Sequence, residues 1–215
     1  MHYLKIYTKY AKKENLKYKQ FLNDACSGDT DQMRVYNRLL FAFLSVNTSY
    51  DKTAKAYDDM KNKYWLDTTE TMNKLLEHGI HYAASRAGYI ALTSNDFISN
   101  YDSFLIGDCE SWNDYRNRLV EKIKGLALVK VSFFITLVYK DADICCLDRW
   151  VLRLMGKKDP EKFMRLLAHR NRYQRLEAIL RKQAQSIKIP LFQYQWAAWD
   201  KIQNKPNAME VLHGS

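Results

Sequence analysis

The chain has 215 residues, 47% of them hydrophobic, and 34 basic against 24 acidic side chains give a net charge of +10. That length and hydrophobic content suit one domain with a substantial core, whereas seven glycines and three prolines are too few for a strand-rich, turn-rich architecture. No hydrophobic run reaches the roughly 20 residues that cross a bilayer, and the first residues lack the hydrophobic stretch of a secretory signal. We therefore expect an intracellular protein with no membrane partner.

Hydrophobic residues recur at helical spacing from the start of the chain, and no segment shows the alternation of a strand. The pattern predicts a first helix over residues 4–25. A break at 27–30 follows, in which Asp29 or Thr30 can cap the next helix. A further helix begins near Ser49.

The middle of the chain carries clear helix boundaries. Asp67 and Glu70 fit a capping box, and Gly79 fits a left-handed helix end. The next helix is predicted over 81–92, and it is followed by one capped at Ser94.

The carboxyl-terminal half begins with an amphipathic helix over 111–123. A tight turn at 124–127 separates it from a very hydrophobic helix over about 129–139. Basic helices follow from Arg149 onward, and Pro160 stands where a helix can begin.

The four cysteines are Cys26, Cys109, Cys145 and Cys146. Their spacing fits neither a zinc nor an iron–sulfur site, and the adjacent pair lies in a hydrophobic run. We interpret that pair as reduced core residues and predict no metal and no other cofactor.

Basic residues gather near both ends of the chain. The two groups are Lys5, Lys9, Lys12, Lys13, Lys17 and Lys19, and Arg165, Arg170, Arg172, Arg175, Arg181 and Lys182. This distribution favours nucleic acid as a partner, although a solvated helix face explains each group as well.

Three separated segments resemble the helix-hairpin-helix DNA glycosylases, in the order that this superfamily uses. The first, residues 41–49 (FAFLSVNTS), is similar to the family helix that ends in Leu-Ser-x-Gln-Thr. Asn47 stands where the family has Gln, a residue that in the relatives fills the gap left by an extruded base. Considered alone, the segment is equally a helix end with a polar turn.

The second segment, residues 79–90, resembles the Gly-aromatic segment before a Lys-Ala-x-x-Ile helix, and alone it is ordinary helix packing. The third is the turn Lys124, Gly125, Leu126, Ala127 and Leu128, which resembles the family hairpin. Backbone amides at the start of a helix can hold a DNA phosphate without a side chain. The hairpin departs from the family because Ala replaces its second Gly, and Ala fits only where φ is not positive.

Downstream, residues 145–153 resemble the signature that carries the family's catalytic aspartate, at Asp148. Lys130 precedes it by 18 positions, the family's separation for its paired lysine and aspartate. The resemblance implies that Lys130 attacks the sugar and that Asp148 stabilises the positive charge that develops there. Lys130 lies one place further from Gly125 than usual, so Val129 could occupy the catalytic position instead.

Simpler interpretations stand beside these roles. Asp148 can cap a helix, and Lys130 can contact DNA phosphate or solvent. Aromatic residues that could stack on an extruded base are Tyr82, Trp150, Trp196 and Trp199. The dense run that holds the last two also fits a helix packed in the core.

The resemblance implies an all-α, two-lobed helix-hairpin-helix fold, with the chain as one domain over residues 1–215. We expect lobes over about 35–110 and over 111–215 together with 1–34. The implied function is a DNA glycosylase that flips and excises an oxidised or modified base, with AP-lyase activity if Lys130 is the nucleophile.

Among its relatives, the chain is most similar to the lysine-bearing 8-oxoguanine glycosylase/AP lyase branch. We expect it to act as a monomer on double-stranded DNA. Two alternatives are a viral-type thymine-hypermodification enzyme on the same fold and a non-catalytic DNA-binding module.

Overall fold

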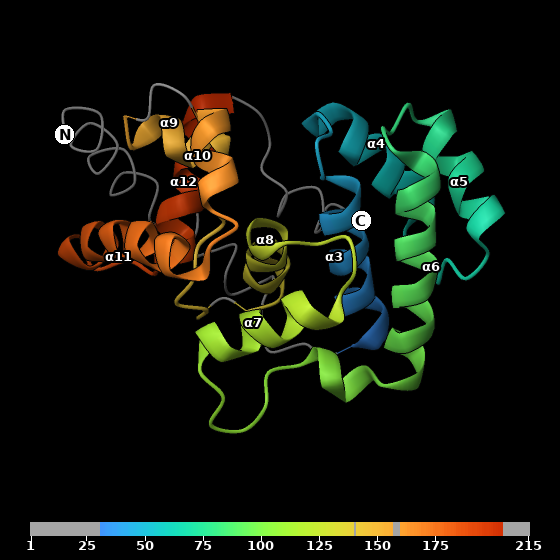
Figure 1. Ribbon diagram of the computed structural model, residues 1–215, viewed down its shortest axis with the longest axis horizontal. Coiled ribbons are helices and arrows are strands. Elements are labelled where there is room, and N and C mark those ends of the chain that lie inside the picture. Colours follow the sequence, from blue (N-terminus) through green and yellow to red (C-terminus); the bar gives the residue numbers. More distant parts are fainter. Residues whose placement is uncertain (1–30, 140, 157–159, 204–215) are drawn as a thin grey trace. The chain divides into compact units, whose positions relative to one another are not determined.

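The computed structural model describes residues 31–139, 141–156 and 160–203, and these form helices with no strand among them (Figure 1). The predicted all-α class is therefore confirmed. The helix predicted over 4–25 lies outside the described residues. The described chain divides into two compact units, one ending at Phe134 and one beginning at Ile135. None of the described helices is long and hydrophobic enough to span a membrane.

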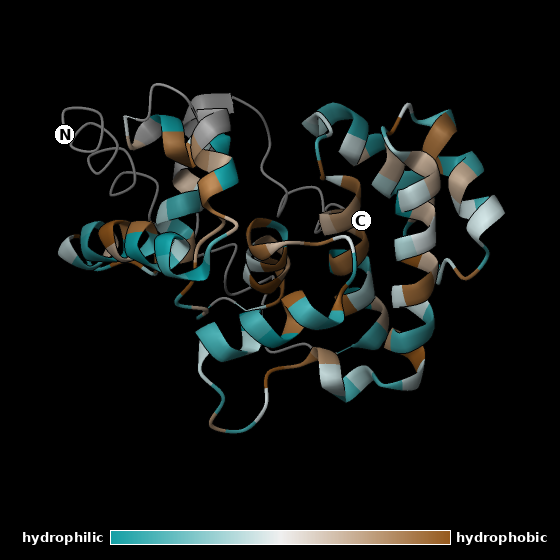
Figure 2. Ribbon diagram, in the orientation of Figure 1, coloured by the Kyte–Doolittle hydropathy of each residue, from teal (hydrophilic) through white to brown (hydrophobic). Residues whose placement is uncertain are grey.

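The first unit is built around α6. Its helices are α3 (Gln32–Leu44), α4 (Tyr50–Met60), α5 (Thr68–Glu77), α6 (Ala83–Ser99), the short 3-10 helix η1 (Tyr101–Phe104), α7 (Trp112–Lys122) and the first part of α8 (Leu128–Val138). Helix α6 packs against α5, α3 and η1, while α3 also packs against α4. Helix α8 is hydrophobic around its circumference (Figure 2), as expected for a helix buried in a core.

The helix starts follow the capping rules. Asp67 and Ser111 each accept a hydrogen bond from a backbone amide of the helix that they precede, and Gly79 is left-handed with φ +62°. The cap of α3 was predicted wrongly at 29–30. It is Asp31, whose carboxylate accepts from the Arg34 amide at 2.9 Å and whose carbonyl accepts the first helical hydrogen bond, from the Val35 amide at 3.0 Å.

The prediction of a separate helix capped at Ser94 is wrong, because α6 runs without interruption to Ser99. The buried Ser94 hydroxyl donates to the carbonyl of Ile90 one turn earlier, at 2.7 Å. Its oxygen also lies 2.6 Å from the hydroxyl of Tyr36 on α3. A serine hydroxyl that donates to a carbonyl one turn earlier is compatible with a position inside a helix, so Ser94 does not mark a helix start.

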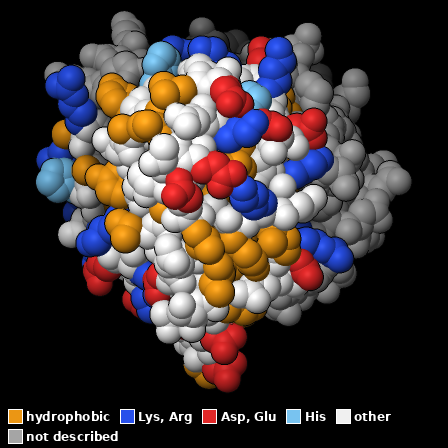
Figure 3. All heavy atoms as spheres, turned by 90° about the vertical axis from the view of Figure 1, so that its right-hand side faces the viewer, with side chains coloured by type: hydrophobic (Ala, Val, Ile, Leu, Met, Phe, Trp, Pro, Cys, Tyr) orange, Lys and Arg blue, Asp and Glu red, His pale blue; other side chains and the backbone are white. Residues whose placement is uncertain are grey.

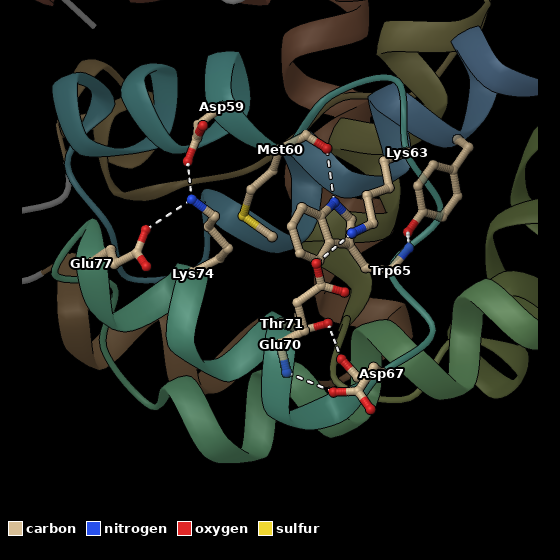
Figure 4. A network of polar contacts seen from close by, with 10 residues as sticks. Asp59, Met60, Lys63, Trp65, Asp67, Glu70, Thr71, Lys74 and Glu77 are labelled. Atoms are coloured by element: carbon tan, nitrogen blue, oxygen red, sulfur yellow. Dashed lines mark hydrogen bonds and ion pairs between the residues drawn. The ribbon is translucent and has the colours of Figure 1, made fainter.

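A polar network joins α4 to α5 (Figure 4). The Trp65 indole donates to the Met60 carbonyl at 2.8 Å, which closes the connection between the two helices. Lys74 pairs with Asp59 on α4 and with Glu77 on its own helix, at 3.1 and 2.9 Å. These ion pairs are largely exposed, so the buried indole contributes more to holding the connection.

The face on which α5 and α6 lie is of mixed character. Figure 3 shows acidic and basic side chains there among hydrophobic ones. Exposed large hydrophobic residues in these two helices are Leu76, Tyr89, Leu92 and Ile98. The net positive charge of the chain is therefore not concentrated on this face.

The second unit contains the end of α8, then α9 (Arg149–Leu154), α10 (Pro160–Leu166), α11 (Arg170–Ser186) and α12 (Leu191–Gln203). Helix α9 packs against α10 and α12, and α11 packs against α12. Cys145 and Cys146 are buried, as predicted for core residues, and form no disulfide among the described residues. Among the described residues, no group of three or more His, Cys, Asp or Glu side chains could hold a metal ion.

Candidate active site and DNA interface

The turn between α7 and α8 requires glycine at one position only. Gly125 has φ +87°, and a Cβ there would lie 2.4 Å from Cδ2 of Tyr89 on α6. Both the backbone conformation and the close approach of the ring exclude a side chain at this position. Ala127 does not have a positive φ, so the departure from the family's second glycine causes no strain.

Backbone amides are available at the start of α8. The amides of Lys130 and Val131 both bond to the Ala127 carbonyl at 2.9 Å, so Ala127 is where helical bonding begins. The amides of Leu128 and Val129 precede these bonds and belong to the first turn, where amides point away from the helix along its axis. This geometry suits a phosphate group, which is what a DNA-binding hairpin needs.

Lys130 lies in the first turn of α8 with its side chain half-buried. Its Nζ donates to the Ser45 hydroxyl oxygen at 2.8 Å and lies 5.2 Å from the centre of the Phe133 ring. Ser45 in turn donates its proton to the Ala42 carbonyl at 2.8 Å. Because a hydroxyl has one proton, Ser45 can only accept from Lys130, which orients the amine.

Asn47 lies two residues beyond Ser45, in the exposed turn between α3 and α4. Its backbone is left-handed, with φ +47°, a conformation that asparagine tolerates better than most residues. Sequence reasoning identified Asn47 but missed Ser45, whose only signal was its place in the Leu-Ser-x-Asn-Thr match. The structure brings this turn next to the amine of Lys130.

Asp148 is the N-cap of α9. Its Oδ1 accepts from the amides of Trp150 and Val151, both at 2.9 Å, and the side chain is half-buried. The interpretation of Asp148 as a helix cap is therefore confirmed. Capping fixes the orientation of the carboxylate, so it is compatible with an electrostatic role in catalysis.

The segment before Asp148 is buried and lies outside any helix, and side chains form hydrogen bonds with its backbone. The Cys145 amide donates to the Glu177 carboxylate and the Cys146 amide donates to the Gln195 side-chain oxygen, each at 2.8 Å. The hydroxyl of Tyr173 accepts from the Leu147 amide at 3.1 Å and donates to the Cys145 carbonyl at 2.6 Å. Sequence reasoning missed all three, because nothing in α11 or α12 shows which side chain will face an unpaired amide.

The aromatic candidates differ in surroundings. Tyr82, in the first unit, has φ +57° and is 73% exposed. In the second unit, Trp150 is half-buried with the Arg153 guanidinium 4.5 Å from the centre of its ring, while Trp196 is buried. The side chain of Trp199 lies outside the described residues. Tyr82 is thus the most accessible of the three described side chains.

Solved structures share this fold. The 8-oxoguanine DNA glycosylase of Methanocaldococcus jannaschii aligns with a TM-score of 0.79 and 22% identity, over 96% of this chain and 98% of that one. The 8-oxoguanine glycosylase/lyase of the same organism, in complex with a 15mer DNA containing 8-oxoguanine, aligns with a TM-score of 0.75 and 20% identity, over 92% of this chain and 97% of that one. For the 8-oxoguanine DNA glycosylase of Thermotoga maritima the values are 0.77, 21%, 95% and 97%.

No curated protein matches the chain. The family model described as 8-oxoguanine DNA glycosylase (Ogg-HhH), in contrast, matches residues 15–189, which span the hairpin, Lys130 and Asp148. This match favours base excision over the two alternatives considered from the sequence. The chain therefore belongs to the 8-oxoguanine DNA glycosylase family, and it is a DNA glycosylase that excises an oxidised base.

Proposed function

We propose that this glycosylase removes 8-oxoguanine from duplex DNA inside the cell and then cleaves the strand, with Lys130 as nucleophile. The observation that carries the proposal is the hydrogen bond between Lys130 and Ser45, because it holds an amine beside the turn that bears Asn47. A solved relative that aligns over most of the chain is a glycosylase/lyase in complex with DNA containing 8-oxoguanine. The family match spans both units, which supports the whole chain acting as one domain.

Binding to the duplex is proposed to use the hairpin and the Asn47 turn. The amides of Leu128 and Val129, at the end of the 124–128 hairpin, receive a phosphate, which positions the protein without reading the base. The target nucleotide leaves the stack at a cost of a few kcal/mol, and Asn47 enters the gap to offset part of that cost. Tyr82, exposed at the start of α6, is available to stack on a base.

Base release is proposed to depend on both charged residues. As the N-glycosidic bond lengthens, the Asp148 carboxylate stabilises the positive charge that develops on the sugar. Neutral Lys130 adds to C1′ while the base leaves with the bonding electrons and takes the proton from the nitrogen. Opening of the sugar ring then gives an imine, and loss of a C2′ proton expels the 3′ phosphate.

The test is borohydride trapping of that imine on duplexes that each carry one altered base. Wild-type protein should form a covalent complex on an 8-oxoguanine duplex, and Lys130→Gln should form none. Lys74→Gln is the matched control, because Lys74 lies in surface ion pairs of the same unit (Figure 4) and should leave trapping unchanged.

Other outcomes would overturn parts of the proposal. A complex that survives Lys130→Gln would place the nucleophile elsewhere. Abasic sites revealed by alkali with no trapped complex would show excision without lyase chemistry. Release of another base in preference to 8-oxoguanine would refute the proposed substrate.

A further inference from the structure

Arg86, on α6, is almost fully buried, with 5% of its surface exposed. Its guanidinium binds three oxygens of the turn between α3 and α4. Nη1 donates to the Leu44 carbonyl at 3.3 Å and to the Thr48 hydroxyl at 3.2 Å, and Nη2 donates to the Val46 carbonyl at 2.7 Å. The side chain of Arg86 therefore forms hydrogen bonds with the residues on both sides of Asn47, Val46 and Thr48.

Burial of this cation is costly, and none of its described partners is a carboxylate. Burial lowers the pKa of the Arg86 guanidinium to about 10, because desolvation disfavours its charged form. A hydrophobic side chain would fill the same volume without that cost. The carbonyls that Arg86 binds stand at the end of α3, where the last carbonyls lack helical partners and carry partial negative charge. The planar fork can satisfy several of them at once.

The shape of the turn matters because of what it presents. Asn47 lies at its exposed tip in a left-handed conformation, between the Val46 carbonyl and the Thr48 hydroxyl that Arg86 binds. The Thr48 hydroxyl donates to the Val46 carbonyl at 2.9 Å. Because Arg86 donates to both of these groups, the three residues form a small hydrogen-bond network around Asn47. Loss of Arg86 would remove the hydrogen bonds that tie both neighbours of Asn47 to α6 and leave the local bond between those neighbours.

We propose that Arg86 is a positioning residue for base extrusion, because it holds the 44–48 turn so that Asn47 projects into the duplex. This inference rests on the proposed role of Asn47. The orientation of Lys130 depends less on Arg86, because Ser45, the partner of that amine, also bonds to the Ala42 carbonyl within α3. Loss of Arg86 should therefore impair extrusion of a stacked base more than it impairs attack by Lys130 on the sugar of an abasic site.

Two substrates separate these steps. Release of 8-oxoguanine from a duplex needs extrusion, whereas borohydride trapping on a single-stranded abasic oligonucleotide needs only Lys130. Under single-turnover conditions, Arg86→Met should slow base release about tenfold and change trapping by less than about twofold. Arg86→Lys should recover part of the loss, because it retains the cation and lacks the fork.

A double-mutant cycle tests whether Arg86 acts through Asn47. Asn47→Ala should slow base release by itself, and Arg86→Met should add little in that background. Arg118→Met is the matched control, because Arg118 also binds backbone carbonyls of the first unit, at Ser103 and Leu105. It should lower Tm without changing the ratio of base release to trapping.

Amide hydrogen exchange of residues 46–49 provides a readout that does not depend on activity. Arg86→Met should accelerate exchange in this turn beyond any change in the rest of the unit. Equal losses in base release and trapping, additive effects with Asn47→Ala, or unchanged exchange would each overturn the proposal. A wild-type protein inactive on every duplex would refute the proposed function, and exchange would still decide whether Arg86 holds the turn.

Discussion

The two proposed catalytic residues lie next to backbone segments that are secured in opposite ways. Beside Lys130, the 44–48 turn leaves carbonyls unpaired, and a buried cation, Arg86, binds them. Before Asp148, the amides of residues 145–147 lie outside any helix, and buried acceptors that include the Glu177 carboxylate bind them. In each case the sign of the buried charge matches the backbone group that lacks a helical partner.

The segments also differ in exposure. The 44–48 turn reaches the surface at Asn47, whereas residues 145–147 are fully buried. A turn with an exposed tip can contact a ligand directly, whereas a fully buried segment cannot move without breaking buried hydrogen bonds. We infer that the first segment suits contact with DNA and the second suits rigid support of a carboxylate.

The largest effect is expected from Asp148→Asn. Asparagine caps helices about as well as aspartate, so α9 should persist with less than about 1 kcal/mol lost in unfolding free energy. Base release in single-turnover kinetics should fall at least about a thousandfold, because the charge that stabilises the sugar cation is gone. Near-normal base release in this variant would show that Asp148 caps α9 and has no catalytic role.

Glu177→Ala tests the rigid support. It removes the carboxylate that accepts from the buried Cys145 amide and that lies 3.5 Å from Arg181. We expect a loss of about 3 kcal/mol in unfolding free energy by urea denaturation. Glu177→Gln is the matched control, since its amide oxygen can still accept from Cys145 and should cost less. Equal losses in both variants would mean that the charge, and not the hydrogen bond to the backbone, secures the segment.

Gly125→Ala tests the hairpin beside the Lys130 region. The new Cβ would clash with Tyr89, and alanine disfavours φ +87°, so we expect a loss of about 1–2 kcal/mol in stability. Affinity for undamaged duplex, measured by fluorescence anisotropy, should also fall, because the amides that bind phosphate would shift. The double variant with Tyr89→Ala removes the clash and leaves the backbone strain. Wild-type affinity in Gly125→Ala would show that the hairpin does not contact DNA.

The sequence predicted what is local. Helix caps at Asp67 and Asp148, the left-handed Gly79 and the break between α7 and α8 depend on residues within one turn of each other, and all are confirmed. The boundary expected at Ser94 failed because a serine inside a helix carries the same local signal as a cap.

Long-range partners could not be predicted. Arg86 and Glu177 each bind backbone more than 30 residues away, and their helices look like ordinary amphipathic segments. Which side chain meets an unpaired carbonyl or amide depends on how helices pack, and periodicity alone does not fix that packing.

The smallest effect concerns Arg118, an arginine that also binds backbone carbonyls yet remains partly exposed, with a carboxylate partner. Its Nε and Nη2 donate to the two oxygens of Glu110 at 2.8 and 2.7 Å. The Arg118 hydrogen bonds, followed by the Gly107 amide, hold the pKa of Glu110 below its usual value of 4.5. A carboxyl whose pKa is lower in the folded state stabilises the fold above the unfolded pKa, and this contribution disappears as pH falls through the folded value.

Glu110→Gln should therefore cost at most about 1 kcal/mol at pH 7, and the difference from wild type should shrink below about pH 4.5. Urea denaturation of both proteins across this pH range measures it. A difference that stays constant down to pH 3 would mean that the pair contributes through shape rather than charge, as the buried Arg86 does with its uncharged partners.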